Sequence, residues 1–124
     1  MQKTYSIFQG EELKIAEKIQ QRRLQILIHS CIYYEMNQNI ISDRQWDKWA
    51  KELRQLQNNY PDISRRVDWY ADFKDWDAST GAFLPLKDKW VVKKAKWLLN
   101  PDFKKFEIPN KPAADKKTGK MKLF

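Results

Sequence analysis

The sequence predicts an all-α fold: a small bundle of about four helices, followed by a flexible basic C-terminal tail. Apolar residues recur at helical spacing in several segments, and residues 11–36 contain neither proline nor glycine. Capping and helix-breaking residues stand where these segments begin and end. The length of 124 residues suits one domain plus a tail, with a modest hydrophobic core. We therefore expect a helical domain over residues 1–100 and an extended or disordered tail over residues 101–124.

The first helix is predicted over residues 11–36. Glu11 and Glu12 suit the positive charge of a helix N-terminus. The run Asn37-Gln38-Asn39 breaks the apolar pattern, so a turn is expected there. The predicted buried face of this helix consists of Leu13, Ala16, Leu24, Leu27, Ile28 and Cys31.

The second helix is predicted to start after Ser42. Ser42 followed by Gln45 is the pattern of a capping box, and Asn58-Asn59 with Pro61 stops the helix. Its apolar residues recur on one stripe, which should face the core. They are Trp46, Trp49, Ala50, Leu53, Leu56 and Tyr60.

Two further helices are expected before residue 101. The third runs from about residue 63 to residue 76, and a turn at residues 78–81 and a short extended stretch at residues 83–86 follow it. The fourth starts after Asp88, a good N-cap, and ends at Asn100-Pro101. The predicted buried faces are Ile63, Val67, Tyr70 and Phe73 in the third helix, and Trp90, Val91, Ala95 and Leu98 in the fourth.

Composition excludes several classes of function. The three glycines lie far apart, so the chain has no Gly-rich phosphate-binding loop. One histidine and one cysteine exclude a structural zinc site of these ligands and leave no convincing catalytic dyad. No apolar run is long enough to span a membrane, and the first residues form no signal peptide. We expect a soluble, cytoplasmic, non-catalytic protein, with which a lone cysteine is consistent.

Half of the net charge of +8 falls in the last 24 residues, which hold seven lysines against three acidic residues. A basic tail adds salt-sensitive, sequence-independent attraction to nucleic-acid phosphates. The alternative is a solvated end that only improves solubility. The tail residues that we expect to take part in interactions are Lys116, Lys117, Lys120, Lys122, Leu123 and Phe124.

The segment from residue 26 to residue 53 holds the candidate binding residues. His29 and Tyr33 share one face of the first helix, and Asp43 and Asp47 share one face of the second. If the helices are antiparallel, aromatic rings face two carboxylates across the bend, which suits a flat cationic or amide-bearing ring. The alternative is that the aromatic residues are core and that Asp43 only stabilises a helix N-terminus. Tyr34 and Trp46 complete the expected group of aromatic residues.

The same segment resembles the small N-terminal helical domain, domain Ia, of bacterial NAD-dependent DNA ligases, over about residues 24–63. The matching pattern is His29, Tyr33-Tyr34, Ile41-Ser42-Asp43, Trp46-Asp47, Glu52-Leu53 and Tyr60-Pro61. In that family the domain captures the nicotinamide mononucleotide (NMN) half of NAD. The resemblance implies that NAD or NMN is an optional ligand, while no cofactor is required. It assigns the binding role to Tyr33, Tyr34, Asp43, Trp46 and Asp47, with His29 as a further candidate.

The chain differs from the ligase pattern at positions that bear on its expected activity. Trp46 stands where the family has tyrosine, and no Lys-x-Asp-Gly adenylation motif exists in the chain, so it is not a ligase by itself. Two carboxylates without further oxygen ligands also make a poor magnesium site. Weak NAD-directed activity that depends on Asp47 stays open. The later part of the chain resembles short ligase-related proteins of bacteriophages and prophages, through Ser79-Thr80-Gly81, Leu84-Pro85, Trp90, Lys94-Ala95 and Leu98-Leu99.

Two functions remain open on this basis. The first is a non-catalytic, phage-type accessory protein that retains a weak nicotinamide nucleotide pocket. The second is a phage interaction protein of DNA metabolism or anti-host defence, which binds a host protein or nucleic acid partly through its tail. Met121, Leu123 and Phe124 resemble the apolar anchors of peptides that bind the bacterial sliding clamp, although they also fit a random apolar end.

Overall fold

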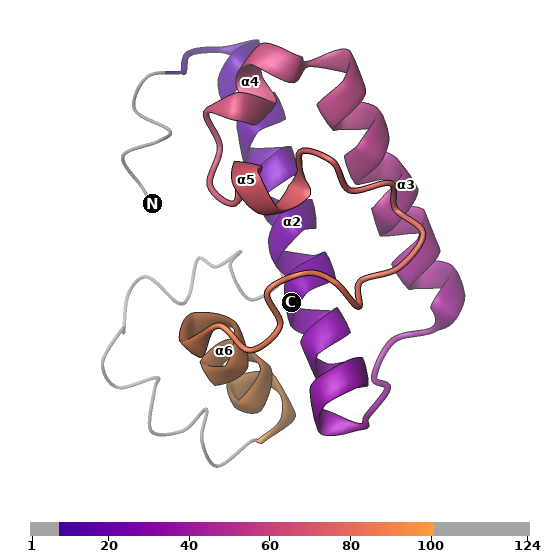
Figure 1. Ribbon diagram of the computed structural model, residues 1–124. Coiled ribbons are helices and arrows are strands. Elements are labelled where there is room, and N and C mark those ends of the chain that lie inside the picture. Colours follow the sequence, from indigo (N-terminus) through magenta and orange to yellow (C-terminus); the bar gives the residue numbers. More distant parts are fainter. Residues whose placement is uncertain (1–7, 101–124) are drawn as a thin grey trace.

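The computed structural model describes residues 8–100, and these residues contain helices and no strand. In the labels of Figure 1, the helices are α2 (Glu11–Met36), α3 (Asp43–Asn59), α4 (Pro61–Arg65), α5 (Tyr70–Phe73) and α6 (Lys89–Leu99). The predicted all-α fold is thereby confirmed. The predicted tail at residues 101–124, with all its candidate interaction residues, lies outside the described part of the chain.

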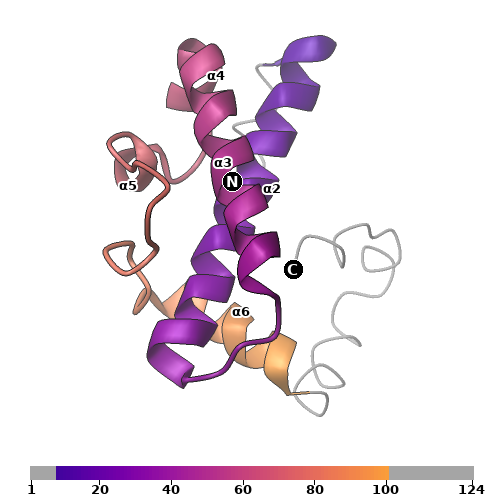
Figure 2. The same ribbon diagram turned by 90° about the vertical axis from the view of Figure 1, so that its right-hand side faces the viewer.

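Helix α2 is the central element of the fold. Helix α3 lies along one side of it and α6 packs across its C-terminal half, as Figures 1 and 2 show from two directions. Residues 23–32 are consequently buried on every side of the helix. Five of the six predicted core positions of α2 are fully buried, and Leu13 is half-buried.

The ends of α2 and α3 follow from local signals, as predicted. Asn37 adopts the left-handed conformation that terminates α2, with φ 57°. The Ser42 hydroxyl accepts a hydrogen bond from the Gln45 N–H and caps α3. Leu53 is fully buried on α3, whereas the prediction that Tyr60 belongs to this buried stripe is wrong. Tyr60 lies beyond the last residue of α3 and is 39% exposed.

The single third helix predicted over residues 63–76 is wrong as well, because the chain breaks into α4 and α5. Between them Trp69 takes a left-handed conformation, with φ 74°. A fully buried arginine from the central helix, Arg23, binds the backbone at this break. Its guanidinium donates to the carbonyl oxygens of Val67 and Asp68, at 2.9 and 3.0 Å. In an uninterrupted helix those carbonyls would accept N–H groups four residues further on.

Arg23 also fastens this segment to the rest of the core. Its Nη2 donates to Ser64 Oγ at 2.6 Å, and its Nε donates to Gln57 Oε1 at 2.9 Å. Gln57 in turn donates to the Phe73 carbonyl at 3.2 Å. One arginine therefore holds α3 and the α4–α5 segment against α2.

Helix α6 begins and ends where the sequence predicts. The Asp88 carboxylate accepts the N–H groups of Trp90 and Val91, and Asn100 follows the last helical residue. Val91 and Ala95 are fully buried, while Trp90 and Leu98 are only half-buried. Trp97, which was not among the predicted core residues, is buried instead. Within residues 8–100, none of the helices combines the length and apolar character needed to cross a membrane.

Candidate binding pocket

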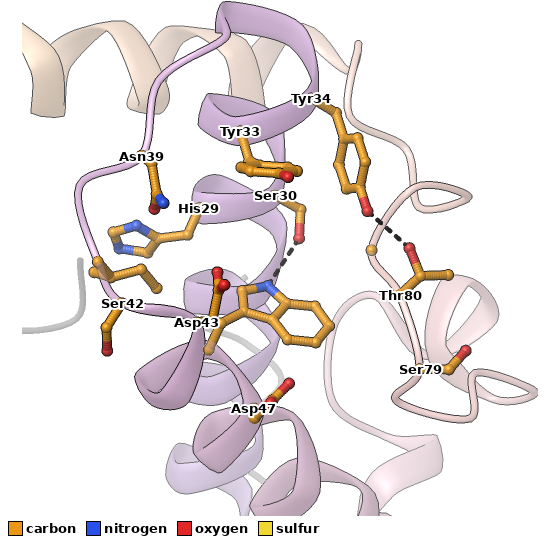
Figure 3. A pocket seen from close by; sticks show the side chains of 13 residues that line it. His29, Ser30, Tyr33, Tyr34, Asn39, Ser42, Asp43, Asp47, Ser79 and Thr80 are labelled. Atoms are coloured by element: carbon orange, nitrogen blue, oxygen red, sulfur yellow. Dashed lines mark hydrogen bonds between the residues drawn. The ribbon is translucent and has the colours of Figure 1, made fainter.

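A cavity of about 310 Å³ opens where α2 ends and α3 begins. The structure brings all the sequence-predicted pocket residues together around it: His29, Tyr33, Tyr34, Asp43, Trp46 and Asp47. The remaining lining residues are Ser30, Asn39, Ile41, Ser42, Ser79, Thr80 and Gly81. The first helical hairpin therefore supplies most of the cavity, and a loop that precedes α6 supplies the rest (Figure 3).

Aromatic side chains form one side of the cavity. Tyr33 and Tyr34 lie at the end of α2 with their rings edge to face and their centroids 4.9 Å apart. They are 52% and 46% exposed, so the alternative that these tyrosines are core is wrong. The half-buried indole of Trp46 comes from α3, and its Nε1–H donates to Ser30 Oγ at 3.2 Å. This bond fixes the orientation of the indole in the cavity.

His29 lies deeper than the tyrosines. Its side chain is buried, and its ring packs against that of Trp49 with the centroids 5.5 Å apart. The histidine thus joins the cavity to the packing between α2 and α3. We therefore place His29 at the buried end of the pocket, where its ring forms part of the floor.

Two carboxylates line the α3 side of the cavity. Asp43 and Asp47 lie in the first two turns of α3, opposite Tyr33 and Tyr34 (Figure 3). Both are exposed, and no lysine or arginine lines the cavity. The cavity is therefore negatively charged and edged by aromatic rings, an arrangement that attracts cations.

The loop of residues 79–81, which we call the STG loop, supplies the other side. Thr80 Oγ1 is hydrogen-bonded to the Tyr34 hydroxyl at 2.9 Å and accepts the Ala82 N–H at 3.1 Å. The Thr80 carbonyl accepts the Trp76 indole N–H at 2.7 Å. The loop therefore holds one aromatic wall of the cavity in place (Figure 3).

The start of the STG loop is fixed by Asp77. The Asp77 carboxylate accepts both the N–H and the hydroxyl of Ser79, at 2.9 and 2.6 Å. These hydrogen bonds, assisted by the charge of Arg54, lower the pKa of Asp77 below its ordinary value. The loop geometry is therefore stabilised while this carboxylate is ionised.

Sequence reasoning predicted a turn at residues 78–81 but did not place it at the pocket. The signal was the Ser-Thr-Gly run itself, in a part of the chain with few glycines. Local patterns do not show which distant helix such a turn contacts. The structure supplies that contact, since Gly81 is buried against Ser30 of α2.

These features define a helical hairpin with an acidic pocket edged by aromatic rings, and comparison with known proteins relates the hairpin to one family. Residues 12–66 match the family described as the DNA ligase-like, N-terminal NAD⁺-binding domain. A DNA ligase of Fervidobacterium nodosum is 36% identical over 50 residues, which cover 40% of this chain and 7% of the ligase. A DNA ligase of Bacteroides fragilis is 38% identical over 50 residues, which cover 40% of this chain and 8% of the ligase. No solved structure shows a significant match.

By these matches, the hairpin formed by α2 and α3 is similar to ligase domain Ia. The chain spans less than a tenth of the length of the ligases that it matches. All the predicted pocket residues fall within the matched residues 12–66, whereas the STG loop lies outside them. The wall that the STG loop forms therefore lies outside the segment that is similar to ligases.

Proposed function

We propose that the pocket binds a nicotinamide nucleotide, NMN or NAD⁺, and that the protein acts as a non-catalytic accessory protein of phage type. The observation that carries this proposal is the convergence of Tyr33, Tyr34, Asp43, Trp46 and Asp47 on one cavity. That cavity lies within the segment similar to an NAD⁺-binding domain. The aromatic rings stack on the nicotinamide ring, and the carboxylates accept hydrogen bonds from its amide or from the ribose.

Size and exposure set the expected affinity. A cavity of about 310 Å³ is at the small end of the range for small-molecule sites, so it suits one half of NAD⁺ better than the whole. The tyrosines that line it are about half exposed, so a ligand remains partly in water. We expect a dissociation constant near ~1 mM, which corresponds to about −4 kcal/mol.

The non-catalytic role is supported by what the similarity covers. It includes the ligand-binding hairpin, and the chain has no Lys-x-Asp-Gly motif for adenylation. The phage-type role rests on the resemblance of the STG loop and α6 segment to short ligase-related phage proteins. On this proposal the protein acts in the cytoplasm of a bacterial host.

Tyr33→Ala tests the binding proposal with a matched control. Tyr33 and Tyr60 are both exposed tyrosines, but only Tyr33 lines the pocket, so Tyr60→Ala is the control. NMN binding is followed by NMR titration of the folded protein. We expect Tyr33→Ala to weaken binding at least tenfold and Tyr60→Ala to leave it unchanged. Absence of binding to the unmodified protein at about 10 mM NMN would refute the proposal.

A second function is favoured by the surface of α6. Lys87, Lys89, Lys93 and Lys96 line one shallow groove together with Val92, and no acidic residue lines it. We propose that this groove and the basic tail bind the phosphate backbone of nucleic acid. Such binding is independent of sequence and falls steeply with salt.

The double variant Lys89→Glu with Lys93→Glu tests this second function. Its control is Lys48→Glu with Lys51→Glu, which makes the same charge change on exposed residues of α3. We expect duplex DNA binding at about 50 mM salt, a large loss at about 200 mM, and a stronger loss in the α6 variant than in the control. If both variants lose DNA affinity equally, the net charge of the protein, and not the α6 groove, is responsible for binding.

A further inference from the structure

The charge of the pocket is unusual for a site that would hold a nucleotide phosphate. Asp43 and Asp47 line it, and none of the lining residues is a lysine or an arginine. Phosphate groups in proteins are ordinarily met by cationic side chains or by free backbone N–H groups. Two carboxylates at the mouth of an open cavity repel a phosphate instead.

The hydroxyls of the STG loop do not compensate for this charge. The Ser79 hydroxyl donates to the Asp77 carboxylate, at 2.6 Å. Thr80 Oγ1 is hydrogen-bonded to the Tyr34 hydroxyl and accepts the Ala82 N–H. Both hydroxyls are therefore already engaged within the chain, and Figure 3 shows the bond between Thr80 and Tyr34.

The same charges favour a particular form of the nicotinamide ring. The oxidised ring of NAD⁺ and NMN is a pyridinium cation, the reduced ring is neutral, and nicotinic acid adds a carboxylate. A flat cation gains from the aromatic rings of Tyr33, Tyr34 and Trp46 as well as from the two aspartates. The neutral and carboxylate-bearing rings lose one or both of these attractions.

We infer that the pocket recognises the nucleoside part of the ligand, an oxidised nicotinamide riboside, by its positive charge, and that it offers no lysine or arginine to the 5′-phosphate. The inference rests on the proposed nicotinamide function and specifies its ligand. The oxidised ring should therefore bind more tightly than the reduced ring, and the 5′-phosphate should add little affinity. Because the carboxylates are exposed, the selection is moderate and is weakened by salt.

NMR titration of the full chain with four ligands tests this inference. The ligands are nicotinamide riboside, NMN, dihydronicotinamide riboside and nicotinic acid riboside. We expect nicotinamide riboside to bind at least as tightly as NMN, and the other two ligands to bind at least fivefold more weakly. Asp47→Asn keeps a hydrogen-bond acceptor but removes a charge, so it should reduce the preference for the oxidised ring to less than twofold. Glu17→Gln, an exposed charge outside the pocket, should leave that preference unchanged.

The outcomes separate the inference from the function on which it rests. Binding of NMN at least tenfold tighter than of the riboside, or equal binding of oxidised and reduced rings, would overturn the inference alone. Failure of all four ligands to bind would overturn the proposed function and the inference with it. A preference for the oxidised ring that survives in both Asp47→Asn and Asp43→Asn would show that the carboxylates are not its source.

Discussion

Gly81 packs against Ser30 so closely that a Cβ atom at position 81 would lie 2.1 Å from Ser30 Oγ and 2.7 Å from Ser30 Cβ. Only glycine allows the STG loop to lie against α2 at this point. The contact matters for the pocket, because Ser30 Oγ also accepts the indole N–H of Trp46. One close approach thus connects the loop, the central helix and an aromatic wall.

Gly81→Ala is therefore expected to displace the STG loop. Overpacking of this kind costs about 1–3 kcal/mol, which urea denaturation of the variant would measure as a lower midpoint. The Ser30→Gly substitution removes the atoms in conflict, so the double variant should be more stable than additivity predicts. A Gly81→Ala protein of unchanged stability would contradict the account of this contact.

The hydrogen bond between Tyr34 and Thr80 is expected to hold the tyrosine at the pocket. Tyr34→Phe and Thr80→Val each remove it, and each should cost roughly 0.5–1.5 kcal/mol at most, since the pair is exposed. In a double-mutant cycle the two losses should be less than additive. Strict additivity in the free energies of unfolding would show that the two side chains do not interact in solution.

Replacing Arg23 by Met is expected to cost more than about 3 kcal/mol. The change leaves the buried carbonyls of Ser64 and Val67 without the guanidinium that donates to them, and each unsatisfied group costs about 1–3 kcal/mol. Arg22→Met is the matched control. The Arg22 side chain is 13% exposed and pairs with Glu52 at 2.9 Å, so a smaller loss of about 1–2 kcal/mol is expected. Similar losses of stability in the two variants would exclude the special role of Arg23.

Cys31 is expected to remain a protonated, unreactive thiol in the folded protein. Burial, and secondly the charge of Glu35, raise its pKa above the ordinary value. Because the folded-state pKa is raised, the stabilising contribution of this thiol is complete below about pH 8.5 and declines as pH rises above it. Denaturation curves of the native protein and of Cys31→Ala between pH 7 and pH 10 would reveal this decline. A thiol reagent that labels the folded protein as fast as the unfolded one would contradict the burial.

The hairpin part of the pocket could be predicted from the sequence because its signals are local. The absence of proline and glycine defines α2, Ser42 caps α3, and residues four apart share a helix face. Two adjoining antiparallel helices then bring their facing side chains together. The predicted residues consequently surround one cavity, and their binding of a nicotinamide nucleotide stays a prediction.

The parts that were missed depend on contacts between distant residues. At the break between α4 and α5 the backbone carbonyls bind Arg23, which lies more than 40 positions away in the sequence. A hint existed, because Arg23 occupies the same helical row as Ala16, Ile19 and Leu27, all of which are buried. The contact of Gly81 with Ser30 had no comparable hint, so the STG loop could be predicted as a turn but not as a wall of the pocket.

The indole N–H resonance of Trp46 gives the most direct test of the central claim, that this cavity holds a nicotinamide ring. The resonance is assigned with Trp46→Phe and followed in an NMR titration with NMN. Trp46 lines the cavity, whereas Trp90 and Trp97 do not. We predict a saturable shift of the Trp46 signal and no comparable shift of those two. Saturable binding that leaves Trp46 unmoved, or no binding at about 10 mM NMN, would contradict the claim.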